Sequence, residues 1–196
     1  METKKIIGRV GVRQATKFTL ALWLAACCSS GFAAQADAFV PLVRSMADRL
    51  NTADQVALSK WDTGEPVYAP QREAQVISNA AAVASDYGIA AQDATNIFTD
   101  QIEANKVVQY SLLNNWRRQG RAPATPRQSL SDVRPALDKL QLSIVQNLQG
   151  VAALRGNAEC QTLVALATKQ VAQETSLDAL HLVALDRAVA RVCVRS

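Results

Sequence analysis

The sequence predicts an all-α protein, a single domain built as a bundle of about six helices. Its 196 residues are 49% hydrophobic but only 5% aromatic, and they include eight Gly and six Pro. A β-sandwich needs more aromatic and β-branched runs and more frequent turns than this composition supplies. Apolar side chains also recur at steps of three and four residues along most of the chain, which is the spacing of one buried helix face.

Six helical segments follow from this periodicity and from the positions of Gly and Pro. The first has an apolar stripe that includes Phe39 and Leu50. Pro70, a favourable first-turn residue, begins the second, and Ser176 is expected to cap the last. The stretch 120–127 holds two prolines and is predicted to be a linker. The expected helices cover approximately residues 37–60, 70–87, 91–118, 131–148, 158–174 and 176–194.

The first 36 residues have the order of a secretory signal peptide, with basic, then apolar, then small residues. The uncharged run Phe18–Ala26 is about half the length of a bilayer span, so no stable transmembrane helix is expected. Cleavage after Ala36, which ends an A-x-A sequence, would place the protein in the periplasm or outside the cell. An alternative processing site is residues 24–27, LAAC, which resemble the sequence at which bacterial lipoproteins are cut and lipidated on Cys, here Cys27.

The exported chain, residues 37–196, is predicted to have a core over 37–148 and C-terminal bracing helices over 157–196. Its two cysteines, Cys160 and Cys193, both fall in the bracing helices. Two such thiols in an oxidising compartment favour a disulfide. Closing this loop would stabilise the fold by about 4 kcal/mol in the chain-entropy model. Two unrelated buried thiols are the alternative.

The charge distribution argues against nucleic-acid binding. Residues 1–36 hold five of the 21 basic and one of the 17 acidic side chains, so the rest of the chain carries 16 of each. Counterion release requires a concentrated positive face, which a balanced domain does not provide. Because His181 is the single histidine, a zinc site is also improbable, and no metal or cofactor is expected.

Several polar residues occur at spacings that bring them to one helix face. Arg49 and Lys60 are 11 residues apart, so on one continuous helix they would lie within about 20° of each other. Asn105 and Gln109 are at i and i+4 and also share a face. Spacing alone does not define a site, because solvated lysines and arginines on an amphipathic helix give the same pattern.

Two segments, taken in order, resemble the all-helical chorismate mutases. Residues 60–73, KWDTGEPVYAPQRE, resemble the K-x(n)-P-V-x-D-x-x-R-E segment of that family. Residues 97–109, IFTDQIEANKVVQ, resemble its I/L-F-x-x-x-I-x-x-S/T/N-x-x-x-Q/E helix motif. The signal peptide, the extra C-terminal helices and the cysteine pair are similar to its exported (gamma) subclass. The resemblance covers about residues 40–195 and is strongest over 49–118.

The resemblance implies a type II-like fold and the Claisen rearrangement of chorismate to prephenate, an isomerase reaction of the shikimate pathway and aromatic amino acid biosynthesis. The reaction is pericyclic and unimolecular, so it needs no nucleophile, metal or cofactor. The enzyme has to hold a dianion in its reactive shape and stabilise the charge that separates across the breaking ether bond. The resemblance also implies a homodimer in which each active site lies within one chain.

The family's carboxylate-binding residues correspond to arginines of this sequence. By resemblance, Arg49 and Arg134 would clamp one or both substrate carboxylates, and Arg72 would bind the other. Bidentate guanidinium contacts fix the orientation of a carboxylate as well as its position. Asn105 would support the ring or a carboxylate.

The remaining expected contacts concern the ether oxygen and the ring hydroxyl. Lys60 and Gln109 would donate to the ether oxygen, and with Arg72 they are the expected catalytic residues. Glu73 would accept a hydrogen bond from the hydroxyl. Two positions depart from the family pattern: Ala69 stands where Asp is usual, and Gln109 stands where exported members often carry Glu.

Two other functions remain open from the sequence. A non-enzymatic helical envelope adaptor or lipoprotein could use the same scaffold. An isochorismate pyruvate lyase is the second alternative, because small changes in the pocket separate the two pericyclic reactions.

Overall fold

The computed structural model describes residues 20–194, and this part of the chain is helical, without a β-strand. The all-α prediction is therefore confirmed. The predicted basic segment of the signal peptide lies outside the described residues. The chain divides into two units, residues 1–34 and 35–196, and the description below concerns the second. The elements in chain order are α1 (Leu20–Asn51), α2 (Ala53–Thr63), α3 (Pro70–Asp86), α4 (Ala91–Gln119), α5 (Leu130–Gly150), the 3₁₀ turn η1 (Ala152–Leu154), α6 (Cys160–Glu174) and α7 (Ala179–Ala188).

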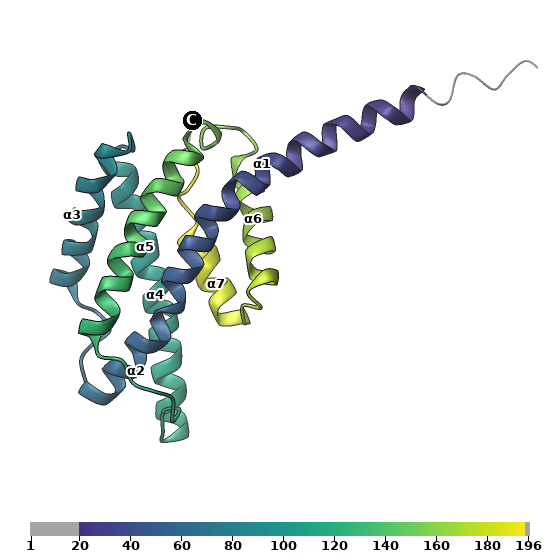
Figure 1. The fold of residues 1–196 in the computed structure, drawn as a ribbon. Helices are drawn as coiled ribbons and strands as arrows, with labels where there is room; N and C mark the ends of the chain where they lie inside the picture. The colour runs from purple at the N-terminus through teal and green to yellow at the C-terminus, as the bar shows by residue number, and fades with distance from the viewer. Residues whose placement is uncertain (1–19, 195–196) are drawn as a thin grey trace, which may run out of the picture. The chain divides into compact units, whose positions relative to one another are not determined.

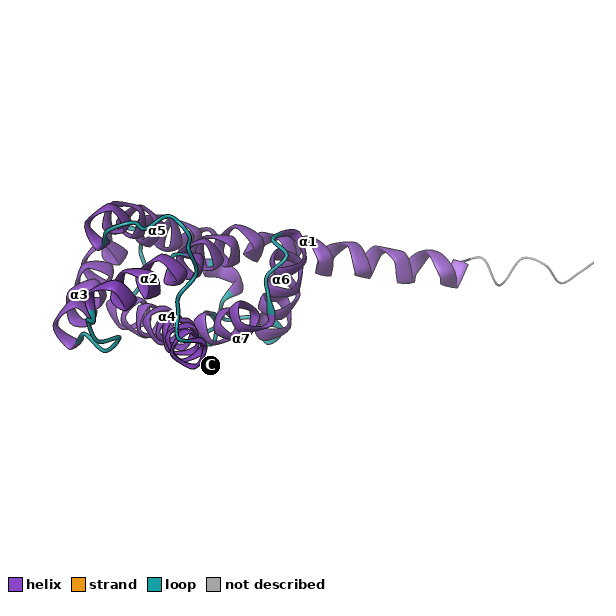
Figure 2. Cartoon of the chain, turned by 90° about the horizontal axis from the view of Figure 1, so that it is seen from below, coloured by secondary structure: helices purple, strands orange, loops and turns teal. Residues whose placement is uncertain are grey.

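The long helices α4 and α5 form the middle of the bundle. In two perpendicular views α3 lies at one end of it, while α6 and α7 lie at the opposite end (Figure 1 and Figure 2). The main apolar cluster takes residues from all seven α-helices, with Phe39, Phe98, Ile144, Leu163 and Leu185 among its fully buried side chains. Burying each of these side chains contributes about 1.5–3 kcal/mol.

The predicted helix over residues 37–60 is divided into α1 and α2 at Thr52. Oγ1 of Thr52 donates to the carbonyl oxygen of Arg49 over 2.7 Å, and the backbone N–H of Thr52 donates to the same oxygen over 3.3 Å. A threonine side chain that competes for the backbone in this way tightens the last turn and ends the helix. The apolar spacing continues across the break, so periodicity did not reveal it.

A second, smaller apolar cluster holds α2 against α4. It contains Ala57, Leu58, Val67, Leu113 and Trp116. Trp116 also packs edge-to-face on Trp61, with ring centroids 6.1 Å apart. This cluster fixes the end of α2 and the segment after it, from which several polar side chains project.

The prediction that Ser176 caps the last helix is wrong. α7 begins at Ala179, and its N-cap is Asp178, whose side chain accepts a hydrogen bond from the backbone N–H of His181 over 2.8 Å. Ser176 instead has a φ of 52°, in the left-handed region. It terminates α6, since its N–H donates to Gln173 O and the next N–H donates to Ala172 O. These are the two bonds of a Schellman motif, which Ser fills here in place of the usual Gly.

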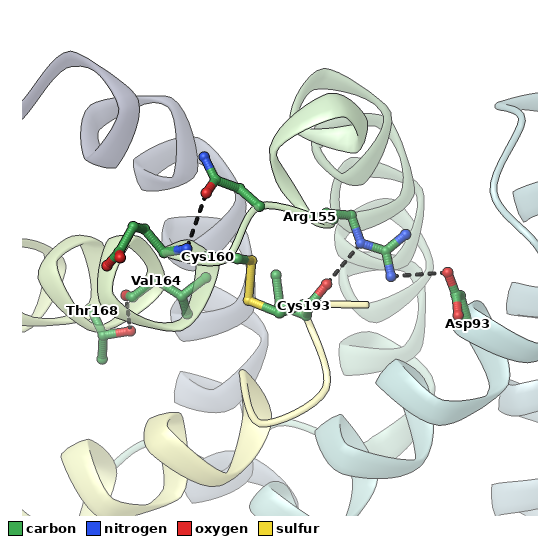
Figure 3. Close-up of a disulfide and its surroundings, with 9 residues drawn as sticks. Asp93, Arg155, Cys160, Val164, Thr168 and Cys193 are labelled. Carbon is green, nitrogen blue, oxygen red and sulfur yellow. Dashed lines mark hydrogen bonds and ion pairs between the residues drawn. A yellow bond between two sulfur atoms is a disulfide. The ribbon is translucent and has the colours of Figure 1, made fainter. Parts of the chain in front are cut away.

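The predicted disulfide between Cys160 and Cys193 is present, and it ties the start of α6 to the segment after α7 (Figure 3). The buried side chain of Arg155 reinforces the same place. Its Nε donates to the carbonyl oxygen of Val192 over 2.7 Å, and its guanidinium pairs with Asp93 at the start of α4 over 3.0 Å. The C-terminal helices are thereby attached to α4 as well as to each other.

A second polar contact attaches the C-terminal region to the middle of α4. The fully buried carboxylate of Asp100 pairs with Arg187 of α7 and with Arg191 just beyond it. The neighbouring Gln101 donates from Nε2 to the carbonyl oxygen of Ala188 over 3.2 Å. A buried carboxylate with two guanidinium partners is strongly position-specific. These contacts lie about one turn before Asn105 and two turns before Gln109, the polar pair expected on α4.

His181 connects α7 to α2. Its Nε2 lies 3.2 Å from Oδ1 of Asp54 at the start of α2, and its Nδ1 lies 3.0 Å from Oδ1 of Asp178. The hydrogen bond with Asp54 raises the pKa of His181 to about 9, with burial opposing the shift and Asp178 adding to it. The imidazole is therefore a charged structural link at neutral pH.

Unfolding free energy should fall as the pH rises toward 9. Because the folded pKa is raised from 6.5 to about 9, the stabilisation is complete below about pH 6.5 and disappears as the pH passes through about 9. Both carboxylates are largely exposed, so the effect is on the order of 1 kcal/mol. Urea unfolding at pH 6, 7.5 and 9 should show this loss in the wild type and not in His181→Asn. An identical pH dependence in the variant would contradict the assignment.

Candidate active site

A cavity of about 320 Å³ lies between the end of α1, α2, α3, α4 and α5. The loop after α2 completes its wall. The seven residues that the sequence analysis selected for substrate binding all line this cavity, although they come from five different helices. They are Arg49, Lys60, Arg72, Glu73, Asn105, Gln109 and Arg134.

Arg49 contributes a buried positive charge to the cavity. It stands in the last turn of α1 and is 5% exposed. Burial and, to a lesser extent, the neighbouring Arg72 lower its pKa to about 10, and Asp138 only partly opposes this shift. Among the described residues its Nε has no hydrogen-bond partner. A buried guanidinium in this state favours the binding of an anion.

Lys60 directs its ammonium group from the last turn of α2 toward the same space. α2 ends at Gly64, whose φ of 74° lets the chain reverse. The reversal brings the carbonyl oxygens of Pro66 and Val67 to 2.8 Å and 3.0 Å from Lys60 Nζ. Burial lowers the pKa of Lys60, against the opposing effect of nearby carboxylates. Two of its three N–H donors are thus held by fixed carbonyls, which orients the third.

Asn105 and Gln109 form a buried amide pair on one face of α4, as their spacing predicted. Gln109 Nε2 lies 2.5 Å from Asn105 Oδ1, and within the described structure Gln109 Oε1 is buried without a partner. Reversing both amides would preserve the bond and free the NH₂ group of Gln109 instead. In either orientation Gln109 has spare hydrogen-bonding capacity.

The first turn of α3 carries Arg72 and Glu73. Ala69 is the N-cap and has no side chain that can cap the helix. Glu73 Oε1 accepts from the backbone N–H of Ala69 over 3.1 Å, which holds this carboxylate at the start of the helix. Arg72 is exposed at the rim of the cavity.

Arg134 reaches the cavity from its own chain, on the first part of α5. This helix begins at a capping box in which Ser129 and Asp132 bond each other's backbone N–H groups. Arg134 is exposed at the rim, and Asp138 follows it one turn later on the same face. The rim thus has two arginines, while Arg49 and Lys60 lie deeper.

Five further polar residues, none of them expected from the sequence, also line the cavity: Glu65, Tyr68, Lys106, Asp138 and Gln141. Asp138 could have been found as the i+4 neighbour of Arg134, and Lys106 as the residue after Asn105. With them, the described lining has five cations and three carboxylates. No group of three or more His, Cys, Asp or Glu in the described residues is placed to hold a metal ion.

Fold and site together define an all-helical protein with a small basic cavity that can enclose an anion. Residues 41–110 match the chorismate mutase type II family. A crystal structure of chorismate mutase from Burkholderia phymatum is 75% identical, with a TM-score of 0.81, and the match covers 82% of this chain and 99% of that one. The chorismate mutase from Burkholderia thailandensis is 32% identical, with a TM-score of 0.76, over 80% and 99% of the two chains. A secreted chorismate mutase from Mycolicibacterium smegmatis is 29% identical over 81% of this chain and 87% of the relative.

These matches show that the chain belongs to the type II chorismate mutase family. The fold and the family suggested by the sequence motifs are therefore confirmed.

Removing the buried charge of Arg49 should stabilise the unliganded protein. Met fills a similar volume without a charge, so Arg49→Met is expected to raise the free energy of unfolding by about 1 kcal/mol or more. Arg44→Met is the control, because Arg44 on the same helix pairs with Glu174 at the surface; it should change stability by less than about 0.5 kcal/mol. Denaturant unfolding without ligand measures both. A destabilised Arg49→Met would mean that Arg49 supports the fold rather than a ligand.

Proposed function

We propose that this chorismate mutase converts chorismate to prephenate in the cavity between α1 and α5. The observation that carries the proposal is the convergence of Arg49, Lys60, Arg72, Gln109 and Arg134 on one small cavity. Excess positive charge there fits a dicarboxylate. The reaction needs no covalent step, which suits a site that supplies cations and amides.

The three arginines would bind the two carboxylates. Arg49, buried and beside Arg72, would hold one carboxylate at the inner wall, where its unpartnered Nε gains an acceptor. Arg72 and Arg134 would close on the substrate from the rim. Holding both carboxylates selects the diaxial conformer in which the reacting carbons approach each other.

Lys60 and Gln109 would stabilise the charge that develops on the ether oxygen as the C–O bond breaks. The ammonium of Lys60 is fixed by two carbonyl oxygens, so its remaining N–H needs no reorganisation to reach the oxygen. Gln109 would add an amide N–H from the other side. Donors fixed in advance in a space with little water are worth more than the same donors in solution.

We also propose that the protein is exported and acts as a homodimer. Export is supported by the signal-like residues 1–36 and by the names of the relatives, among them a secreted chorismate mutase from Mycobacterium tuberculosis, whereas the homodimer is proposed from the family resemblance alone. None of the helices in residues 20–194 has the length and hydropathy of a membrane span. Cleavage after Ala36 remains the proposed processing site, and lipidation of Cys27 is the alternative. The mass of the exported protein distinguishes them, and sedimentation tests the dimer.

Purified protein should consume chorismate and form prephenate, and Lys60→Ala should lower kcat by roughly 10²–10³-fold, the usual effect of removing one transition-state donor. The control is Lys139→Ala, an exposed lysine of α5 outside the cavity lining, which should retain full activity. Pyruvate and salicylate from isochorismate, without prephenate, would identify a lyase. Absence of both reactions would identify a non-enzymatic protein. Full activity of Lys60→Ala would contradict the placement of the ether oxygen.

The rate should be nearly independent of pH between about pH 5 and 8, because the amide of Gln109 can donate a hydrogen bond at every pH in this range. Gln109→Glu should be active only in acid, since a carboxyl group donates only while it is protonated and its ordinary pKa is about 4.3. The measurement is kcat against pH for both proteins. A wild-type rate that falls steeply between pH 5 and 7 would show that a carboxyl group limits the reaction.

A further inference from the structure

Lys106 of α4 lines the cavity beside Asn105 but has no assigned task. Its side chain is only 13% exposed, and its Nζ lies 3.1 Å from Oε2 of Glu73 and 2.8 Å from Oε1 of Glu103. The ring of Tyr68, also in the lining, has its centroid 5.4 Å from the same nitrogen. Lys106 is thus held on three sides at the wall formed by α3 and α4.

These contacts keep Lys106 charged. Partial burial would lower its pKa, but the hydrogen bonds to Glu103 and Glu73 outweigh it and raise the pKa above the ordinary value. The aromatic ring favours the ammonium form as well. Lys106 therefore keeps the positive charge that its ion pair with Glu73 requires.

Glu73 needs such a partner because of where it stands. It follows Arg72 in the sequence and shares the cavity with Arg49 and Arg134. A glutamate side chain that rotated freely could form an ion pair with one of these arginines. That arginine would then be neutralised and could no longer bind a substrate carboxylate. The present contacts prevent this: Oε1 accepts from the N–H of Ala69, and Oε2 accepts from Lys106.

We infer that Lys106 is a positioning residue: its ion pair holds the Glu73 carboxylate at the α3–α4 wall, where that carboxylate accepts the ring hydroxyl of the substrate and leaves the arginines unneutralised. The inference rests on the proposed function. The residue at position 69 supports the inference, because Ala69 supplies no second carboxylate that could accept the ring hydroxyl or pair with Lys106. Lys106 acts through Glu73 and makes no contact with the reacting atoms.

The test is a double-mutant cycle on Lys106 and Glu73, with KM and kcat for chorismate measured separately. Lys106→Met should raise KM roughly 10-fold or more, as expected for the loss of a hydrogen bond to a charged group, and change kcat by less than about threefold. In the Glu73→Gln background the same substitution should add less than about twofold. Lys106→Arg should restore most of the affinity because it keeps the charge.

Glu103→Gln is the matched control, because it removes the other carboxylate on Lys106 and lies outside the cavity lining; it should leave KM unchanged. Circular dichroism melts establish that each variant is folded. If Lys106→Met does not fold, Lys106→Gln is used in its place. An unchanged KM for the folded Lys106 variant overturns the inference, as does an equal loss in the Glu73→Gln background. Wild-type protein that forms no prephenate overturns the proposed function itself, which is a separate result.

Discussion

The buried guanidinium of Arg49 is the feature on which the rest of the site depends. It is 5% exposed, its Nε is unpartnered within the described structure, and a second cation, Arg72, lies close enough to lower its pKa. Isolated charges of this kind are unfavourable inside a protein unless a counter-charge arrives. In the proposed mechanism a ligand with two carboxylates would supply that counter-charge, so the cost of burying Arg49 would be converted into affinity and orientation.

The architecture serves to keep these charges in place. Lys60 is held by the reversal after α2, and α2 is held by the tryptophan pair and by the His181 link. On the other side, α4 is attached to the C-terminal helices through Asp100 and Arg155, so Asn105 and Gln109 project from a rigid support. The disulfide strengthens that support from outside the cavity. A site that works by preorganisation requires this rigidity.

Much of this arrangement could be predicted from the sequence. Apolar periodicity indicated the helices because each buries one long face, and the resemblance to the chorismate mutase family indicated all seven selected lining residues. The ends of two helices were harder to predict. Thr52 ends α1 because its side chain bonds the backbone, and Ser176 terminates α6 in a left-handed conformation that is usually adopted by Gly. The Lys106–Glu73 pair joins residues 33 apart in sequence. The carboxylate with which Lys106 pairs depends on how α3 packs against α4, and the spacing of residues in the sequence does not determine that packing.

Equilibrium binding of a stable bicyclic dicarboxylate that has the shape of the rearranging substrate measures most directly whether the buried charge selects a dianion. Calorimetry would compare this dianion with its monomethyl ester, which has the same shape but one charge fewer. The dianion should bind at least about 100-fold more tightly, a difference of about 2.7 kcal/mol, and its affinity should be largely lost in Arg49→Met. Equal affinity for the two compounds would contradict the claim that unpaired buried charge organises this protein around a doubly negative ligand.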